Sequence, residues 1–437
     1  MTRANDPKKP TTHNPASLTA RTDRELIRST HRSERFVLVE LMAPPRTSDA
    51  RREPVNVCFV LDRSGSMSGR KIELARKAVE VAIDRLLPED RFAVVAYDDR
   101  IDVVVESTPA SREAKDGALA RIRSIDARGS TDLGGGWLTG AEQVARHLEA
   151  AKGGGVHRVL LLTDGLANQG ITEPTELTRH AAELRARGVS TTTFGVGEDF
   201  DERLLAGMAD AGGGHFYFIE RPEQIPDLIA SEVGELLEIV ARDVALEITA
   251  PDGLEIEPLS PFPMERRGNR TAILLGDLVA EQRLEAVLRL RFGYGTLGSE
   301  VGVLVGVTDR DGALAAAGLT PVALGWRYAD DATNDAQPRD RSVDRRVAAL
   351  FAARARQNVI RLNRAGSYAA AVAQLRAVAR RIEAYAGSDA ELREVALGLR
   401  ENEERWAAPA PEAARKVAFA ASSYAMRSRG PQGRAGR

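Results

Sequence analysis

Between residues 55 and 239 the chain alternates short apolar segments with longer segments in which apolar residues recur every three or four positions. Residues 55–61 are strongly apolar, which is typical of a strand buried on both faces of a sheet. Residues 70–87 follow with apolar side chains at helical spacing. Repeated alternation of strand and helix predicts an α/β domain with a doubly wound, mainly parallel sheet. The carboxyl ends of its strands share one edge, where such folds bind ligands.

A different pattern covers the rest of the chain. After residue 240 the segments alternate apolar and polar residues between Gly and Pro turns, which indicates an antiparallel β-sandwich. Residues 36–42 have the same strand character, so we expect them to join that sheet, with the α/β domain inserted in it. The predicted organisation is a disordered tail (1–30), a strand joining the β domain (31–54), the α/β domain (55–239), a sandwich-like domain (240–330), a polar linker and a C-terminal helical domain (341–428).

Charge and cysteine content narrow the possible partners. The formal net charge is -2, and the basic stretch at residues 341–364 is typical of solvated helix faces, so we expect no nucleic-acid ligand. Residues 1–28 are polar, so we expect no secretory signal there, and we expect no membrane span because no apolar run is long enough. Cys58 is the single cysteine, and we interpret it as a small buried residue. These features favour a cytoplasmic protein without a membrane span.

The loop after residues 55–61 carries the most informative side chains. It reads Asp62-Arg63-Ser64-Gly65-Ser66, and a predicted helix follows. Asp62 supplies a carboxylate, and Ser64 and Ser66 supply hydroxyl oxygens two residues apart. Such hard oxygen ligands suit Mg²⁺, with Mn²⁺ or Ca²⁺ as alternatives, rather than zinc.

Two further loops are expected at the same edge of the sheet. Thr131 lies in a glycine-rich loop before a predicted helix, and Asp164 follows the strand at residues 158–162. Two carboxylates would neutralise a divalent ion, and three hydroxyls add no charge. Because Mg²⁺ prefers six ligands, one position stays open for an Asp or Glu from a partner.

The three loops, in this order on an α/β pattern, resemble the metal-ion-dependent adhesion site of von Willebrand factor A (vWA) domains. The resemblance covers about residues 55–238 and implies a Rossmann-like fold, metal-mediated protein binding and an acidic protein ligand. It also implies that Ser64, Ser66 and Thr131 are direct ligands, and that Asp62 and Asp164 bind directly or through water. The flanking regions are similar to bacterial vWA-domain proteins and to the heavy chains of inter-alpha-trypsin inhibitor, although this likeness is less specific.

Simpler interpretations exist for the same residues. Ser66 or Ser68 could cap the helix that begins near residue 70, and Asp164-Gly165 could be only a turn. Arg63, Met67 and Trp137 are candidates for partner contacts beside the ion. Arg63 could equally be a solvated charge, and Trp137 could be a helix residue packed against the sheet.

Three classes of function remain open from the sequence. The first, which we favour, is a non-enzymatic module whose metal bridges to an acidic residue of a partner protein. A Mg²⁺-dependent hydrolase or phosphatase is the second, although Ser64 occupies the position at which haloacid-dehalogenase-type phosphatases need a second Asp. The third is a scaffold whose metal serves only stability. No catalytic residue is predicted.

Overall fold

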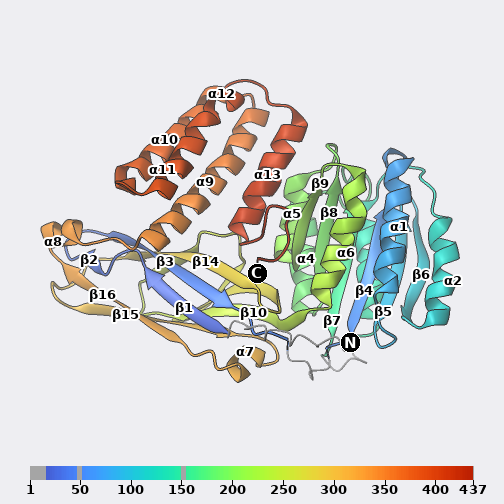
Figure 1. The fold of residues 1–437 in the computed structure, drawn as a ribbon, viewed down its shortest axis with the longest axis horizontal. Coiled ribbons are helices and arrows are strands. Elements are labelled where there is room, and N and C mark those ends of the chain that lie inside the picture. Colours follow the sequence, from blue (N-terminus) through green and yellow to red (C-terminus); the bar gives the residue numbers. More distant parts are fainter. Residues whose placement is uncertain (1–15, 47–51, 149–153, 437) are drawn as a thin grey trace, which may run out of the picture.

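The computed structural model describes residues 16–46, 52–148 and 154–436, and it contains an α/β domain, a β-sandwich and a helical region (Figure 1). The α/β domain holds one six-stranded sheet in which every neighbouring pair except β5–β6 is parallel. In spatial order its strands are β6 (Ile101–Pro109), β5 (Arg91–Tyr97), β4 (Val55–Asp62), β7 (Val156–Thr163), β8 (Ser190–Val196) and β9 (Gly213–Ile219).

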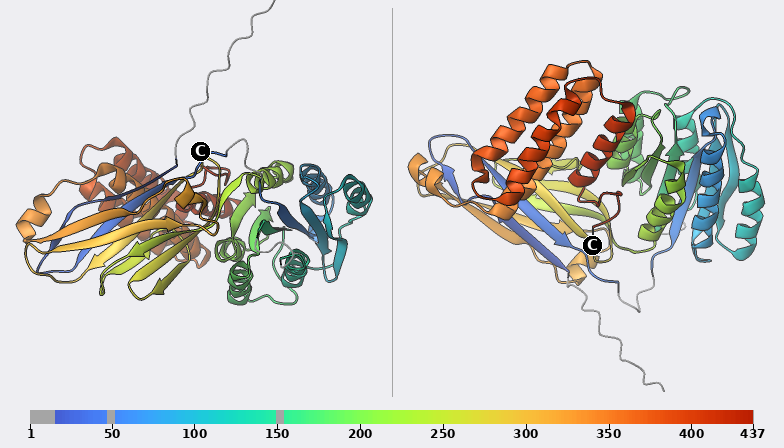
Figure 2. Two further views of the ribbon diagram at one scale, coloured as in Figure 1. Left: turned by 90° about the horizontal axis from the view of Figure 1, so that it is seen from below. Right: turned by 45° about the horizontal axis from the view of Figure 1, so that its top comes forward.

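Helices cover both faces of this sheet (Figure 2). One face is covered by α1 (Arg70–Asp84), α2 (Arg112–Arg123) and α6 (Ile225–Leu236), with the short turns η1 (Gly65–Met67) and η2 (Pro222–Gln224). The other is covered by α3 (Leu133–Ala145), α4 (Pro174–Ala186) and α5 (Glu202–Ala211). All eight residues of β4 are buried, as are all eight of β7. The predicted doubly wound α/β fold is therefore confirmed.

The glycines of α3 have a steric role. A Cβ atom on Gly136 would lie 2.4 Å from the ring of Tyr97, and one on Gly140 would lie 2.3 Å from a methyl group of Val60. Only glycine permits the helix to approach the sheet this closely. The approach fixes the start of α3, and with it the loop that carries Thr131.

Two antiparallel sheets form the sandwich. The first contains, in order, β1 (Ser17–Thr22), β3 (Ser33–Met42), β14 (Arg283–Phe292) and β11 (Glu255–Pro258). The second contains β12 (Met264–Arg267), β13 (Arg270–Val279), β10 (Ile239–Thr249), β15 (Glu300–Thr308), β16 (Val322–Ala329) and the parallel strand β2 (Leu26–Arg28), and α7 (Ala313–Ala316) follows β15. Their inner faces share one core. Because β3 precedes the α/β domain and pairs with β14 along ten positions, the α/β domain is inserted between β3 and β10.

The prediction of a disordered tail over residues 1–30 is wrong for its second half. Residues 17–22 form β1, which pairs with β3, and residues 26–28 form β2, which pairs with β16 about 300 positions away. Both strands are short, and their backbone hydrogen bonds go to partners distant in sequence, so a local pattern carries little signal for them. Residues 1–15 lie outside the described residues.

The C-terminal helices are α8 (Asp331–Ala336), within the expected linker, and α9 (Arg341–Arg364), α10 (Tyr368–Ala386), α11 (Ala390–Glu401), α12 (Glu403–Trp406) and α13 (Glu412–Met426). α9 packs on the outer face of the four-stranded sheet, where Val343 and Leu350 meet Leu38. α13 contacts the α/β domain, and the buried ammonium of Lys416 lies 2.7 Å from the buried carboxylate of Glu202. The helices therefore bridge the sandwich and the α/β domain.

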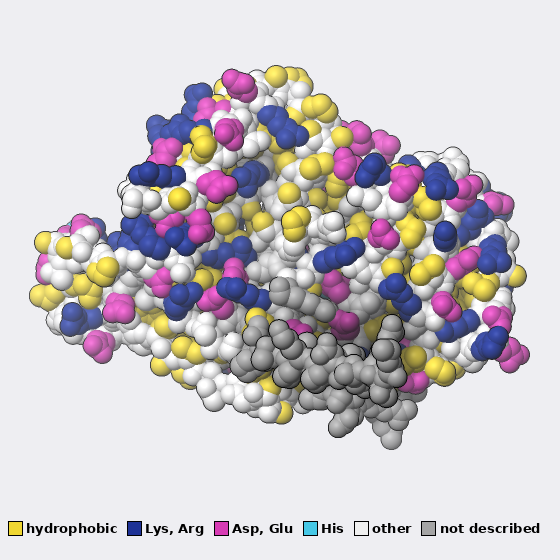
Figure 3. Space-filling model, in the orientation of Figure 1, with side chains coloured by type: hydrophobic (Ala, Val, Ile, Leu, Met, Phe, Trp, Pro, Cys, Tyr) yellow, Lys and Arg dark blue, Asp and Glu magenta, His cyan; other side chains and the backbone are white. Residues whose placement is uncertain are grey.

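The surface carries charges of both signs without a large region of one sign on the face in Figure 3. This agrees with the formal net charge of -2. Within the described part of the chain, no helix has both the length and the hydropathy that crossing a bilayer requires.

Candidate metal centre

The two predicted acidic ligands leave the sheet side by side. Asp62 ends β4, and Asp164 follows β7, its parallel neighbour. The backbone N–H of Ser64 donates to Asp62 Oδ1 at 2.8 Å, which turns the chain back over the strand end. Thr163 donates its hydroxyl proton to Asp62 Oδ2 at 2.6 Å. Each oxygen of Asp62 therefore accepts a hydrogen bond, one from its own loop and one from the last residue of β7.

A chain of hydrogen bonds joins the first loop to the third. The hydroxyl oxygens of Ser64 and Ser66 lie 3.1 Å apart, and Ser66 donates to Asp164 Oδ1 at 2.7 Å. Asp62, Ser64 and Asp164 are buried, whereas Ser66 is exposed. The cluster of oxygen atoms therefore opens to solvent on the side of Ser66.

Thr131 belongs to the second loop and is also buried. Its backbone N–H donates to Asn168 Oδ1 at 3.0 Å, and its carbonyl accepts from the N–H groups of Asn168 and Gln169. Its hydroxyl oxygen lies 3.6 Å from the place that a Cβ on Gly165 would take. The second loop is thus tied to the third, with the hydroxyl of Thr131 beside the residue that follows Asp164.

Electrostatics at the site favour a bound cation. Burial, together with the smaller effect of the charge of Asp164, raises the pKa of Asp62 to about 6 against the opposing hydrogen bonds of Thr163 and Ser64. A divalent ion among these oxygens would relieve the cost of burying two neighbouring carboxylates. The donors are carboxylate and hydroxyl oxygens only, and this set fits a hard cation.

Lys71 is a member of the site that the sequence did not indicate to us. Its ammonium lies 2.5 Å from Asp164 Oδ2, and its side chain is 27% exposed. It is the second residue of α1, where the helix dipole disfavours a positive charge. The signal in the sequence was a lysine in the first turn of the helix, five positions after Ser66. Its charge would repel an incoming cation.

Replacement of Lys71 by methionine is expected to raise the affinity for Mg²⁺ by about 3- to 10-fold, because it removes a partly screened positive charge next to a ligand. Calorimetric titration of the full chain at fixed ionic strength measures this. Lys77→Met on the exposed face of α1 is the matched control and should leave affinity unchanged. A loss of affinity in Lys71→Met would instead mean that Lys71 helps to assemble the site.

The three predicted partner-contact residues are buried, and this part of the prediction is wrong. Arg63 pairs with Asp98 at 3.3 Å and with Asp102 at 2.5 Å, so its charge is used to tie the first loop to the β5–β6 hairpin. Met67 is fully buried in the core beneath α1. Trp137 is fully buried as well, and its Nε1 donates to Thr191 Oγ1 at 3.2 Å, which supports the alternative of a packed helix residue.

A different apolar residue lies at the surface beside the oxygens. Leu166, two positions after Asp164, is 55% exposed. Its neighbours Asn168 and Gln169 are exposed and polar. The signal in the sequence was a single leucine in an otherwise small and polar loop, which gives little ground for choosing it without the structure.

Comparison with known proteins supports the assignment of the domain. The family described as von Willebrand factor type A domain matches residues 56–231. The uncharacterized protein YfbK of Escherichia coli is 32% identical over 215 residues, which are 48% of this chain and 36% of that protein. Human inter-alpha-trypsin inhibitor heavy chain H4 is 32% identical over 164 residues, which are 37% of this chain and 18% of that protein. The matched regions therefore span well under two thirds of either relative.

A solved structure is similar over nearly the whole chain. The von Willebrand factor type A protein from Catenulispora acidiphila superposes with a TM-score of 0.68 at 19% identity, and it covers 90% of this chain and 97% of its own. At this identity the likeness concerns the fold. It includes the sandwich and the helices in addition to the α/β domain.

Proposed function

Because residues 56–231 form a von Willebrand factor type A domain, a class that in general mediates metal-dependent protein interactions, we propose that this chain binds a protein through a divalent ion. Asp62, Ser64, Ser66, Thr131 and Asp164 would hold the ion, directly or through water. A carboxylate of an Asp or Glu on the partner would complete its coordination.

The observation that carries this proposal is the hydrogen-bonded series Asp62, Ser64, Ser66 and Asp164, in which the one exposed member is Ser66. An ion bound to buried oxygens with one open side must take its remaining ligands from solvent or from another molecule. Since three of the five proposed ligands are neutral hydroxyls, the ion keeps enough positive charge to attract another carboxylate. Mg²⁺ is our first choice of ion, with Mn²⁺ and Ca²⁺ as alternatives.

The role is proposed to be non-enzymatic. Nucleophilic phosphoryl transfer of the haloacid-dehalogenase type needs a second carboxylate where this chain has Ser64, and Ser64 uses its hydroxyl within the site. We also propose a cytoplasmic location, in agreement with a single, fully buried cysteine.

A partner captured from native lysate should bind the full chain in Mg²⁺ and be released by a chelator. Leu166→Ala should weaken this complex by about 10-fold without changing Mg²⁺ affinity, because it removes an exposed apolar contact next to the ion. Leu397→Ala in α11 is the matched control, since Leu397 is also 55% exposed. Binding to the purified partner is measured by calorimetry.

Two outcomes would contradict the proposal. Equal capture with and without chelator, together with a chelator-induced fall in thermal stability, would indicate a structural ion instead. Hydrolysis of a generic phosphoester in Mg²⁺ that disappears in Asp62→Asn would indicate an enzyme.

A further inference from the structure

A cavity of about 480 Å³ lies where the α/β domain, the sandwich and the helical region meet. α5 and β9 supply one side, α9 and α13 supply another, and Pro261 of the sandwich closes a third. Its volume is in the range of small-molecule binding sites, which also tend to lie between domains. The metal centre does not contribute to its lining.

One face of α9 lines this cavity with polar side chains alone. Arg354, Gln357, Asn358 and Arg361 follow one another at the spacing of a single helix face. The fully buried positions of α9, among them Leu350 and Ile360, are mostly apolar, as expected of a helix face packed between domains. The four polar residues on the cavity side would instead suit contact with a polar ligand.

The positive charges of the lining exceed the negative ones. Arg427 is paired with Asp210, the one acidic residue of the lining, and Arg429 is paired with Glu235 at 2.7 Å. The remaining guanidinium groups, those of Arg203, Arg354 and Arg361, form no ion pair with any described residue. Three such groups line one cavity, and guanidinium groups are suited to binding phosphate and carboxylate groups.

Burial makes the charge of Arg354 costly in the absence of an anion, whereas Arg203 and Arg361 are exposed. Burial lowers the pKa of Arg354, an effect that the charge of Glu257 opposes and that of Arg289 reinforces. The guanidinium of Arg354 donates to the carbonyl of Pro258 at 3.0 Å, and that of Arg361 donates to Asn358 Oδ1 at 2.8 Å. The neutral carbonyl leaves the partly buried charge of Arg354 without an adjacent counter-charge, which a bound anion would supply.

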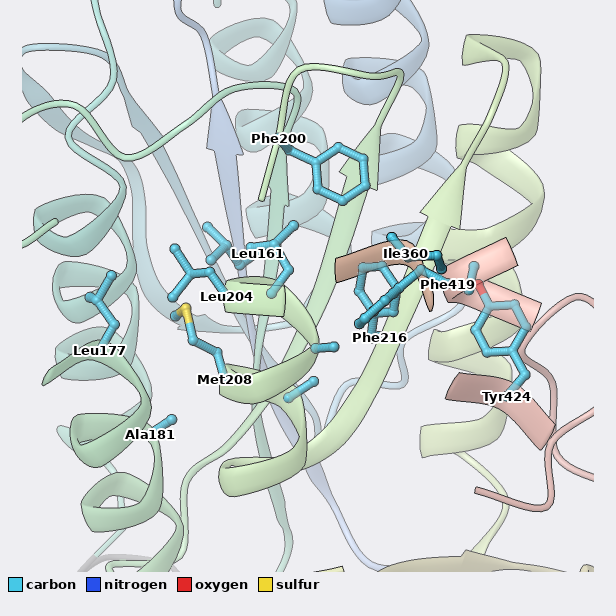
Figure 4. Close-up of a cluster of buried hydrophobic side chains, with 14 of the residues drawn as sticks. Leu161, Leu177, Ala181, Phe200, Leu204, Met208, Phe216, Ile360, Phe419 and Tyr424 are labelled. Carbon is cyan, nitrogen blue, oxygen red and sulfur yellow. The ribbon is translucent and has the colours of Figure 1, made fainter. Parts of the chain in front are cut away.

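The cavity also has an aromatic wall. Phe216 of β9 and Phe419 of α13 meet edge to face with ring centroids 6.2 Å apart, and Tyr424 lies beside them (Figure 4). A ligand that filled the cavity would therefore contact both aromatic rings and guanidinium groups. This combination favours an aromatic molecule that carries an acidic group.

We propose that this cavity binds a small aromatic anion, with Arg203, Arg354 and Arg361 contacting its phosphate or carboxylate group. Binding joins residues from the α/β domain and the helical region, so the ligand would stabilise their contact. The site is independent of the metal centre.

The test uses 1-naphthyl phosphate and the full chain. Calorimetric titration should show saturable binding with a Kd below about 1 mM, unaffected by a chelator. The double variant Arg354→Gln/Arg361→Gln should bind at least about 10-fold more weakly, as should Arg203→Gln, because charge-assisted hydrogen bonds are lost. 1-Naphthoate replaces phosphate by carboxylate and identifies the preferred acid, while neutral 1-naphthol should not bind.

Arg380→Gln is the control, since Arg380 is exposed on α10 and outside the cavity lining. Arg203 is exposed at the start of α5, so its replacement tests the site even if the double variant is unstable. Absence of saturable binding of both naphthyl acids up to about 10 mM would overturn the proposal, as would unchanged binding in the arginine variants. Equally tight binding of inorganic phosphate would overturn its aromatic part.

Discussion

Replacement of Asp62 by asparagine is expected to lower the affinity of the chain for Mg²⁺ by at least about 100-fold while the fold is retained. Asparagine has nearly the same volume and can accept the 2.8 Å hydrogen bond from the backbone of Ser64. It removes one of two carboxylates that would neutralise the ion, so the loss should be electrostatic rather than steric. Calorimetric titration with Mg²⁺ and Mn²⁺ measures the affinity, and thermal unfolding without metal measures the stability of the variant.

Asp126→Asn is a matched control, because it makes the same change of charge at a residue that is 87% exposed. It should bind Mg²⁺ as the unmodified chain does. Retained Mg²⁺ affinity in Asp62→Asn would place the ion elsewhere. Loss of partner binding in this variant, with no response to added Mg²⁺, is the expected consequence for function.

Replacement of Glu232 by glutamine is expected to reduce the free energy of unfolding by about 3–5 kcal/mol, because it leaves a buried guanidinium without its main counter-charge. Glu232 is fully buried, and Arg158 Nη1 donates to it at 2.9 Å. It also accepts from Thr192 at 2.7 Å and from Tyr217 at 2.8 Å. Thermal and urea unfolding of the full chain measure the change.

The pH dependence of this contribution has a definite sign. Burial opposes ionisation of Glu232, but His215, Arg158 and Arg429 hold its pKa well below the ordinary 4.5. Its stabilising effect is therefore present above about pH 4.5 and declines as the pH falls toward the pKa in the folded state. The difference in stability between the chain and Glu232→Gln should shrink over the same range.

Glu80→Gln is the control for this variant. Glu80 pairs with Arg123 at 2.9 Å, but the arginine side chain is 66% exposed, so the loss should stay below about 1 kcal/mol. An equal effect of both substitutions would mean that Glu232 and Arg158 contribute no more than a surface pair.

The ligand atoms of His215, Glu232 and Glu235 lie within 4.8 Å of one another, a spacing that could suit a metal ion. Arg158 and Arg429 already supply the positive charge of this cluster through their bonds to Glu232 and Glu235.

The architecture could be predicted from the sequence where periodicity was strong and local. The buried strands β4 and β7 and the loops that end them stand out as apolar runs followed by Asp, and the parallel sheet follows from their alternation with helices. β2 could not be predicted because its three residues pair with β16, whose sequence is remote. α8 could not be predicted either, because its segment is too short and too polar to indicate a helix.

For the metal centre, the sequence predicts the ligands better than it predicts the residues around them. The spacing of Asp62, Ser64 and Ser66 indicates an oxygen cluster without any knowledge of the surroundings. Which neighbours face outward depends on packing, and Trp137 is buried because glycines allow α3 to approach the sheet. The pairing of Lys71 with Asp164 and the exposure of Leu166 near it could be recognised only from the structure.

The insertion of the α/β domain has a mechanical consequence. The chain enters β4 from the sandwich at Val55 and leaves α6 for β10 after Leu236, and Arg158 binds both Glu232 of α6 and Asp277 of β13 near these crossings. Asp62 and its loops lie at the opposite ends of the strands. A pulling force applied by a molecule bound at those loops would therefore be transmitted along the whole of β4 before it reaches the sandwich. The ion pair between Lys416 of α13 and Glu202 of α5 also joins the α/β domain to the helical region, so part of such a force would pass to that region.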